Sequence, residues 1–346
     1  MKKSSFFILT VLVASLLSEC GSDKGKNANG FGAPVELRAD SIAIREILQP
    51  KSWVAAGDKA IVGSGKGSDS LVYVYSLPEF RCLYAGLRTG GGPGELANPY
   101  AELVQKYDRD GRFLLYHFGS GRMYHFTATD TGFAVGGAKE LTRGVDEGYS
   151  GGELLVDSDI PWDSDPNVKQ NVYLYLYDMS TGNILDSVLS QSVFSPTPGK
   201  NYGAFKNGTI SLYNGNLCAV VYGNTGRVEY YDISSGKLEF KGTVGDNTPV
   251  EKLMEVNFDT WKGPDYREGA TDGKYLYVLM NEIRLDSHGK KQIVSSSVLV
   301  YDWEGHPVKW IKLDKAVDNI LTGTGKIYAY DSDRDFEQVY VFNTGL

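Results

Sequence analysis

Carboxylates at alternate positions near the C-terminus are the first candidate for chemistry. The segment 331–335 reads DSDRD and contains Asp331, Asp333 and Asp335. A hard cation such as Ca²⁺ needs several converging oxygen ligands, and calcium loops begin with this spacing. Such loops also need glycine at the sixth position and glutamate at the twelfth, where this chain has Phe336 and Phe342. We interpret the segment as a solvated hairpin loop, with a calcium site as the alternative.

A second acidic group lies in the middle of the chain. Asp157, Asp159, Asp163 and Asp165 surround Trp162. The spacing matches no complete metal-binding motif, so a solvated loop is the favoured interpretation and a cation site the alternative. Trp162 adds an aromatic surface that a binding partner could contact.

No residue pattern predicts a catalytic centre. The four histidines, at positions 117, 125, 288 and 306, show neither an HExxH motif nor another metal-ligand spacing. A G-x-S-x-G string does occur once, as GYSGG at 148–152, but it lies in an all-β repeat pattern without the strand-to-helix turn that exposes a nucleophilic serine. We therefore expect no catalysis and no cofactor, with calcium as the exception named above. The alternative is a metal-dependent hydrolase of the lactonase type, whose ligands would surround a central channel.

Aromatic residues in two long connecting segments predict a recognition surface. Tyr202 ends one of these segments, while Trp261, Tyr266 and Arg267 belong to the other. Tyrosine and tryptophan offer a large contact area with a polar edge, which suits sugar rings or peptide side chains. The other interpretation, to which we give more weight, is that these rings cover the ends of the sheets as packing.

A repeated sequence pattern marks the strands that must position these residues. Six stretches share an alternating strand that runs into a turn rich in Tyr, Asp and Gly: 71–78 (LVYVYSLP), 122–132 (RMYHFTATDTG), 171–183 (NVYLYLYDMSTGN), 227–236 (RVEYYDISSG), 298–305 (VLVYDWEG) and 338–345 (QVYVFNTG). Steps of 51, 54 and 70 residues between equivalent positions suit one small sheet each. This period predicts an all-β, six-bladed β-propeller of four-stranded antiparallel blades. A β-sandwich is the alternative, but sandwiches tend to be shorter than this chain.

The blades are assigned from the turn signals between strands. We expect them at 52–87, 100–141, 152–189, 203–244, 266–313 and 317–346, with each repeat as the third strand of its blade. Segment 35–48 alternates like a strand before the first full repeat, and the chain ends just after a third strand. We therefore expect the N-terminal strand to complete the last blade and close the ring without an open edge.

The first residues predict export. Lys2 and Lys3 precede an apolar run, 6–17, that is too short to cross a bilayer as a helix. The following LSECG resembles the lipobox of bacterial lipoproteins, in which Cys20 would carry the lipid, although Glu19 replaces the usual small residue. Plain cleavage and release is the alternative. The expected organisation is a signal peptide at 1–19, a flexible tether at 20–34 and the propeller at 35–346.

The net charge bears on the class of partner, and the cysteine positions bear on disulfide formation. The formal net charge of −8, without a stripe of Lys and Arg, argues against nucleic acid. Besides Cys20, only Cys82 and Cys218 remain, each inside an apolar strand pattern. They fall in blades on opposite sides of the expected ring, so we expect buried free thiols rather than a disulfide.

One loop carries a family resemblance. Segment 87–99 reads LRTGGGPGELANP, and segment 266–280 reads YREGATDGKYLYVLM. Both resemble parts of the six-bladed TolB-like propeller lipoproteins of gut anaerobic bacteria, and the first is also similar to NHL-repeat propellers, which carry such a loop in every blade. The resemblance implies fold and export. Physically, the glycines permit a tight crossing between two blades, in which Arg88 and Glu95 pair or bond the adjacent backbone.

These observations together favour an exported, lipid-anchored and non-catalytic binding module. We expect a monomer in the cell envelope, attached to the outer membrane only through its lipid, on the periplasmic or the surface side. Its partner would be an envelope protein, a peptide or a glycan, bound through Arg88, Glu95 and the aromatic segments. A structural envelope component without ligand affinity is a further alternative.

Overall fold

The computed structural model describes residues 30–46, 49–65, 70–90, 92, 95–96, 101–103, 107–118, 120–142, 147–151, 154–159, 173–189, 209–223, 226–246, 265–287, 290–332 and 336–346. Every element of regular structure in these ranges that exceeds a single turn is a β-strand. None of these residues belongs to a helix long and apolar enough to cross a membrane.

The described strands form six sheets, which we number in chain order. The first sheet contains β3 (Pro50–Ala56), β4 (Lys59–Ser64), β5 (Val72–Ser76), β6 (Cys82–Gly86) and β8 (Tyr107–Asp108). The second contains β7 (Ala101–Leu103), β9 (Arg112–His117), β10 (Arg122–Ala128) and β11 (Phe133–Glu140). The third contains β12 (Glu147–Gly151), β13 (Leu154–Asp159), β14 (Tyr173–Asp178) and β15 (Asn183–Leu189).

The remaining sheets follow the same plan. The fourth contains β16 (Thr209–Asn214), β17 (Leu217–Tyr222), β18 (Arg227–Asp232) and β19 (Glu239–Gly245). The fifth contains β20 (Asp265–Thr271), β21 (Leu276–Leu285), β22 (Lys291–Tyr301), β23 (Pro307–Leu313) and β1 (Val35–Leu37). The sixth contains β24 (Asn319–Gly323), β25 (Lys326–Tyr330), β26 (Gln338–Asn343) and β2 (Asp40–Ala43).

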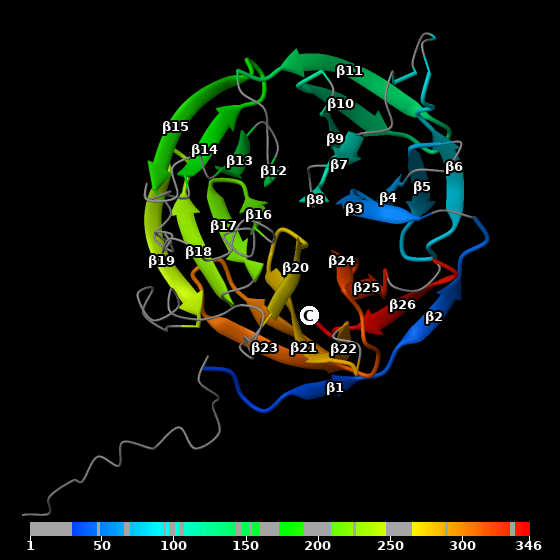
Figure 1. Cartoon of the computed structure of the whole chain (residues 1–346), viewed down its shortest axis with the longest axis vertical. Coiled ribbons are helices and arrows are strands. Elements are labelled where there is room, and N and C mark those ends of the chain that lie inside the picture. The colour runs from blue at the N-terminus through cyan, green and yellow to red at the C-terminus, as the bar shows by residue number, and fades with distance from the viewer. Residues whose placement is uncertain are drawn as a thin grey trace, which may run out of the picture.

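The sheets stand around a common axis, with the first strand of each sheet innermost (Figure 1). Contacts between neighbouring inner strands link β3 with β7, β12 with β16, β16 with β20, β20 with β24, and β24 with β3. The repeats found in the sequence are β5, β10, β14, β18, β22 and β26. Each is the third antiparallel strand of its sheet counted outward, as expected, although in the first sheet the added strand β8 lies inside β3. The all-β ring is thus confirmed.

The N-terminal segment closes the ring, as the sequence predicts. β2 pairs antiparallel with β26, so the outermost strand of the sixth sheet comes from the start of the chain. Two further strands correct the expectation of four antiparallel strands in every sheet. β1 adds in parallel to β23, and β8 adds in parallel to β3, so the fifth and first sheets each have five described strands.

Phe31 packs into the core although the sequence assigns it to the tether. Phe31 lies in the segment interpreted as a tether, yet it is only 2% exposed. Its ring packs edge-on against Tyr301 with ring centroids 5.0 Å apart. The reason is burial of a large apolar side chain, which outweighs the glycine-rich composition of its neighbours.

The core lies between the sheets and is rich in aromatic rings. Trp53 is fully buried and stands edge-on to Tyr330, with centroids 4.7 Å apart. Its indole N–H donates to the backbone carbonyl of Ile320 at 3.1 Å, which ties the first sheet to the sixth. Because each sheet covers an apolar face of its neighbour, the sheets depend on one another for stability.

The repeated aspartate has a local structural role. Asp178 accepts hydrogen bonds from the N–H and hydroxyl of Ser180 at 2.8 and 2.6 Å, and Asp232 does the same with Ser234. These hydroxyl and N–H donors hold the pKa of both carboxyls below the usual range. The turn after the third strand is therefore an Asx turn closed by glycine, which explains the Tyr-Asp repeat.

Candidate functional site

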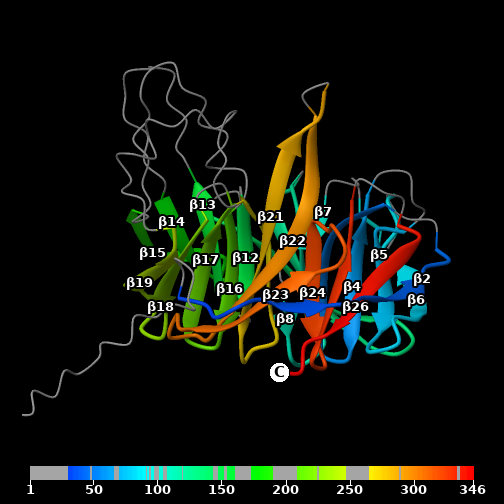
Figure 2. The same cartoon turned by 90° about the horizontal axis from the view of Figure 1, so that it is seen from below.

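The hairpin formed by β21 and β22 is the most prominent described feature of the molecule. Figure 2 shows it projecting beyond the level at which the other strands end. β20 pairs with β21 only as far as Asn281, and β23 pairs with β22 only from Ser296 onward. Residues 282–287 and 290–295 therefore extend past the fifth sheet as a two-stranded ribbon, which we call the projecting hairpin.

Apolar side chains of the projecting hairpin are in contact with solvent. Leu285 is 56% exposed and Val294 is 40% exposed. Ile283 and Ile293 face each other in register and are partly buried. Exposed apolar side chains that gather on one projecting element mark an interaction surface more often than scattered ones do.

Polar contacts keep the projecting hairpin in shape. Arg284 donates to the Glu282 carboxylate at 2.9 Å, and the Ser295 hydroxyl donates to the same carboxylate at 3.2 Å. The Arg284 guanidinium, followed by Ser295, holds the pKa of Glu282 below its usual range. At the tip, Asp286 accepts from the N–H of Lys290 at 2.9 Å. Since an isolated two-stranded ribbon is only marginally stable, these contacts help preserve its shape.

The glycine-rich loop is a tight crossing between the first and second sheets. The Gly92 N–H donates to the Glu95 carboxylate at 2.8 Å, while the backbones of Arg88 and Leu96 bond at 2.9 Å. The expected bond between Glu95 and the adjacent backbone is confirmed. Both Arg88 and Glu95 are exposed, but Glu95 holds its own loop.

Of the aromatic candidates, one is buried in the core and the others lie outside the described residues. Tyr266 is only 1% exposed and packs between the fourth and fifth sheets. It does not belong to a recognition surface, because burial between two sheets leaves its ring inaccessible. Burial raises the pKa of its hydroxyl well above the ordinary value. Arg267 is described only as backbone within β20, and Trp162, Tyr202 and Trp261 lie outside the described residues.

The acidic segments gain little support as cation sites. Asp318 accepts from the N–H of Ser332 at 2.8 Å and from its hydroxyl, which anchors the start of the DSDRD segment. Phe336 packs edge-on against Tyr330 with centroids 5.1 Å apart, which explains an aromatic residue where a calcium loop needs glycine. Asp331 is half-buried, while Asp333 and Asp335 lie outside the described residues, so the calcium alternative stays a prediction.

The second acidic group is split by the structure. Asp157 and Asp159 belong to strand β13, whereas Asp163, Asp165 and Cys20 lie outside the described residues. The sequence interpretation grouped all four carboxylates as one acidic cluster. The sequence did not show that Asp157 and Asp159 lie on a strand, because the apolar residues of β13 are confined to its first half.

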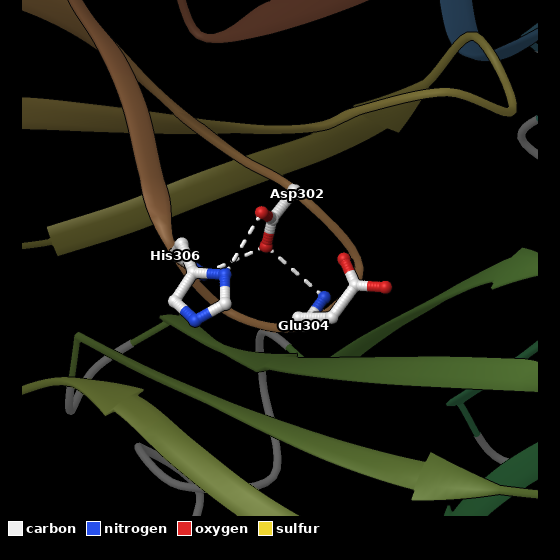
Figure 3. A group of neighbouring side chains, drawn as sticks. All are labelled: Asp302, Glu304 and His306. Atoms are coloured by element: carbon white, nitrogen blue, oxygen red, sulfur yellow. Dashed lines mark hydrogen bonds and ion pairs between the residues drawn. The ribbon is translucent and has the colours of Figure 1, made fainter.

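A different group of donor atoms does come together among the described residues. Asp302, Glu304 and His306 offer three ligand atoms within 4.8 Å of one another (Figure 3). Asp302 accepts from the N–H of Glu304 at 3.0 Å, and its carboxylate also bonds the N–H and ring Nδ1 of His306. Asp302 occupies the same place after a third strand as Asp178 and Asp232. Its oxygens are engaged in closing the turn, so the group is a turn rather than a metal centre.

The two cysteines among the described residues, Cys82 and Cys218, are free thiols, as the sequence predicts. Cys218 is fully buried, whereas Cys82 is only partly buried on the outermost strand of the first sheet. Burial raises the pKa of the Cys82 thiol to about 11 and that of Cys218 further. A role for either thiol as a nucleophile is therefore disfavoured.

Comparison with known proteins places the architecture. A scan of protein-family models finds no match for the sequence, and a search of curated proteins finds none either. An exported protein of Bacteroides fragilis superposes with a TM-score of 0.54 at 9% identity, covering 91% of this chain and 96% of that chain. The fold is that of a β-propeller.

Other solved structures give lower scores. The WD40 domain of Neurospora crassa Pan2 has a TM-score of 0.48 at 9% identity, covering 91% of this chain and 95% of that chain. BamB of Moraxella catarrhalis has a TM-score of 0.41 at 13% identity, covering 89% of this chain and 99% of that chain. At such identities the likeness concerns the fold alone.

The projecting hairpin is the candidate interaction surface that sequence analysis missed. A signal was present, because alternation continues through 276–285 and 291–301 for longer than in other repeats. Length alone does not say how far neighbouring strands cover a hairpin. Only the pairing of β20 and β23 shows that its outer half lies beyond the sheet.

Proposed function

We propose that this protein is an exported, lipid-anchored propeller that acts as a non-catalytic binding module in the cell envelope and binds a protein partner through the projecting hairpin. The observation that carries the proposal is the exposure of Leu285 and Val294 on a ribbon held in shape by its own polar contacts. Apolar side chains favour a protein surface over a glycan, which would need exposed aromatic rings.

The finer architecture and location belong to the same proposal. We infer that each of the six sheets is one blade of the ring. The relationship to TolB-like propeller lipoproteins rests on the LRTGGGPGELANP segment, and the lipid anchor rests on Cys20 in a lipobox-like sequence. The description of the Bacteroides fragilis protein as exported agrees with an envelope location.

The test compares the hairpin with an equally apolar surface elsewhere. A photo-crosslinking residue is placed at position 285, and separately at position 135, in protein expressed with its N-terminal segment intact. Val135 is 67% exposed on β11 of the second sheet. We expect a defined envelope protein to crosslink at position 285 and not at position 135.

Two substitutions then distinguish specific binding from nonspecific adhesion of exposed apolar side chains. The pair Leu285→Lys and Val294→Lys should abolish capture of the crosslinked protein, because burying two charges in an apolar interface is costly. The matched variant Val135→Lys should leave capture unchanged. Equal capture by the hairpin variant and the unmodified protein would remove the projecting hairpin from the proposal. Capture of a glycan alone would overturn the choice of partner.

A further inference from the structure

A bulge recurs where the third and fourth strands of a sheet pair. The ladder skips one residue of the fourth strand in the first five sheets: Leu83, Gly136, Leu185, Lys241 and Val308. A bulge of this kind re-aims the side chains that follow it. The next residues along these strands, which we call the post-bulge residues, are Tyr84, Gly137, Asp186, Gly242 and Lys309.

Three of the post-bulge residues reach the next sheet. The Tyr84 hydroxyl donates to the carbonyl of Gly132 in the second sheet's outer turn. Asp186 accepts from the N–H of Leu238 at 2.8 Å, and the Lys309 ammonium donates to the carbonyl of Thr344 at 2.6 Å. Each acceptor or donor lies after the third strand of the following sheet, so these side chains join consecutive sheets at their outer ends.

The second sheet has glycine at this position and a cleft instead of a bridge. Gly137 has no side chain to reach the turn of the third sheet, which contains Met179 and Ser180. A cleft of about 570 Å³ opens there, lined by residues of β9, β10, β11 and that turn. The volume lies within the range of small-molecule sites.

Glycine alone does not produce such a cleft. The fourth sheet also has a post-bulge glycine, Gly242, yet the gap to the fifth sheet is filled by large side chains. Tyr230 and Val244 both approach Gly305 in the following turn, and Trp303 of that turn is buried. In the second sheet the residue that corresponds to Tyr230 is His125, which is smaller and lines the cleft.

The lining of the cleft combines apolar side chains, the Asp108 carboxylate and two basic groups. Leu114 supplies a small apolar area and Ala138 is exposed at the cleft, whereas Met179 is fully buried beneath it. Arg112 and Lys139 line the same cleft, and the Arg112 guanidinium lies 3.2 Å from the Asp108 carboxylate. That carboxylate also accepts two backbone N–H groups, so its charge is well satisfied within the loop.

Lys139 is the group best suited to recognise a ligand. It is exposed on β11, and no described carboxylate lies within ion-pair distance of its ammonium. An ammonium beside apolar side chains attracts a ligand that carries one negative charge on a small hydrophobic body. Glycine and alanine at 136–138 leave room for such a ligand against the strand.

We propose that the cleft between the second and third sheets binds a small amphipathic organic anion, with its charged end at Lys139 and Arg112 and its apolar body against Leu114 and the strand at 136–138. This site is separate from the projecting hairpin, which belongs to the fifth sheet. Its success or failure is therefore independent of the protein partner proposed above.

The test uses three probes that share one ring and differ in charge: benzoate, benzyl alcohol and benzylamine. Each is titrated into the purified full-length protein and followed by saturation-transfer NMR. We expect benzoate to bind at least about tenfold more tightly than the other two, equivalent to about 1.4 kcal/mol. Equal binding of all three probes, or no binding of benzoate at about 10 mM, would overturn the proposal.

Variants place the binding in this cleft. Lys139→Glu should weaken benzoate binding at least about tenfold through charge reversal, and Ala138→Trp should abolish it by filling the space. The matched control Lys237→Glu makes the same charge change on the exposed turn of the fourth sheet and should leave binding unchanged. Unaltered binding in Lys139→Glu, or equal loss in Lys237→Glu, would remove the ligand from the cleft. Melting temperatures of the variants without probe establish that each is folded.

Discussion

Asp186 on β15 accepts a hydrogen bond from the backbone N–H of Leu238 at 2.8 Å, which joins the third sheet to the turn of the fourth across 52 residues of sequence. Leu238 is buried, so its N–H would otherwise lose its partner away from water. We expect Asp186→Ala to lower the free energy of unfolding by about 1.5 kcal/mol, as for other hydrogen bonds to charged groups.

Urea unfolding followed by tryptophan fluorescence measures the effect. Asp186→Asn is the matched variant, because its side-chain carbonyl still accepts the Leu238 N–H, and it should lose less than half as much stability. If Asp186→Ala unfolds at the same urea concentration as the unmodified protein, the bond does not contribute to holding the two sheets together.

Phe31 gives the second prediction. Its burial against Tyr301 ties the residues before β1 to the fifth sheet. Phe31→Ala should cost about 3 kcal/mol, because truncating a buried phenylalanine removes apolar contact and leaves a cavity. Phe118→Ala is the control, since that ring is 43% exposed. Equal melting temperatures for Phe31→Ala and Phe118→Ala would contradict the packing role.

Phe31 also shows where sequence interpretation stops. The repeats predicted the third strand of every sheet and the closure by β2, because alternation and the Tyr-Asp turn are local signals. The inner strand β12 was missed, and the third blade was placed too late, because EGYSG has no apolar alternation. Phe31 was likewise hidden in glycine-rich surroundings, since one buried ring has no periodicity.

The candidate sites depend on relationships that no single segment contains. The interpretation of Glu95 succeeded because its partner, Gly92, lies three residues away. For Tyr266 the packing interpretation holds, but it could not be derived from one segment because its burial depends on the fourth sheet packing against the fifth. The cleft beside Lys139 was invisible for the same reason, because it arises from Gly137 facing a turn some 40 residues further along the chain.

The two thiols should differ in reactivity. Because burial raises the pKa of Cys82 to about 11, its thiol stays protonated at pH 8 and reacts through a small thiolate fraction. Alkylation by iodoacetamide should be about tenfold to a hundredfold slower than for an ordinary thiol and should speed up as the pH rises toward 11. Cys218, which is fully buried, should resist labelling altogether.

Mass spectrometry of the cysteine-containing peptides measures each rate separately. Protein unfolded in urea is the reference, because both thiols should then react at the same ordinary rate. Cys82→Ser should remove the slow native-state labelling of that peptide without changing the melting temperature by more than a few degrees. Rapid labelling of Cys218 in the folded protein would contradict its burial between the third and fourth sheets.

Asp302, Glu304 and His306 allow a turn to be distinguished from a metal site. If Asp302 closes the turn, Asp302→Ala should lower stability by about 1 kcal/mol, because three donors of the turn lose their acceptor. The loss should be the same with and without a chelator. Glu304→Gln and His306→Gln should change little, since neither side chain is needed to hold the backbone.

A cation bound by all three groups would instead make the melting temperature fall on chelation and would make each of the three variants insensitive to the chelator. Thermal unfolding of the four proteins with EDTA and with added Ca²⁺ or Zn²⁺ decides between these outcomes. The same aspartate position closes the turns at Asp178 and Asp232 without a neighbouring histidine, which is why we expect the result of a turn.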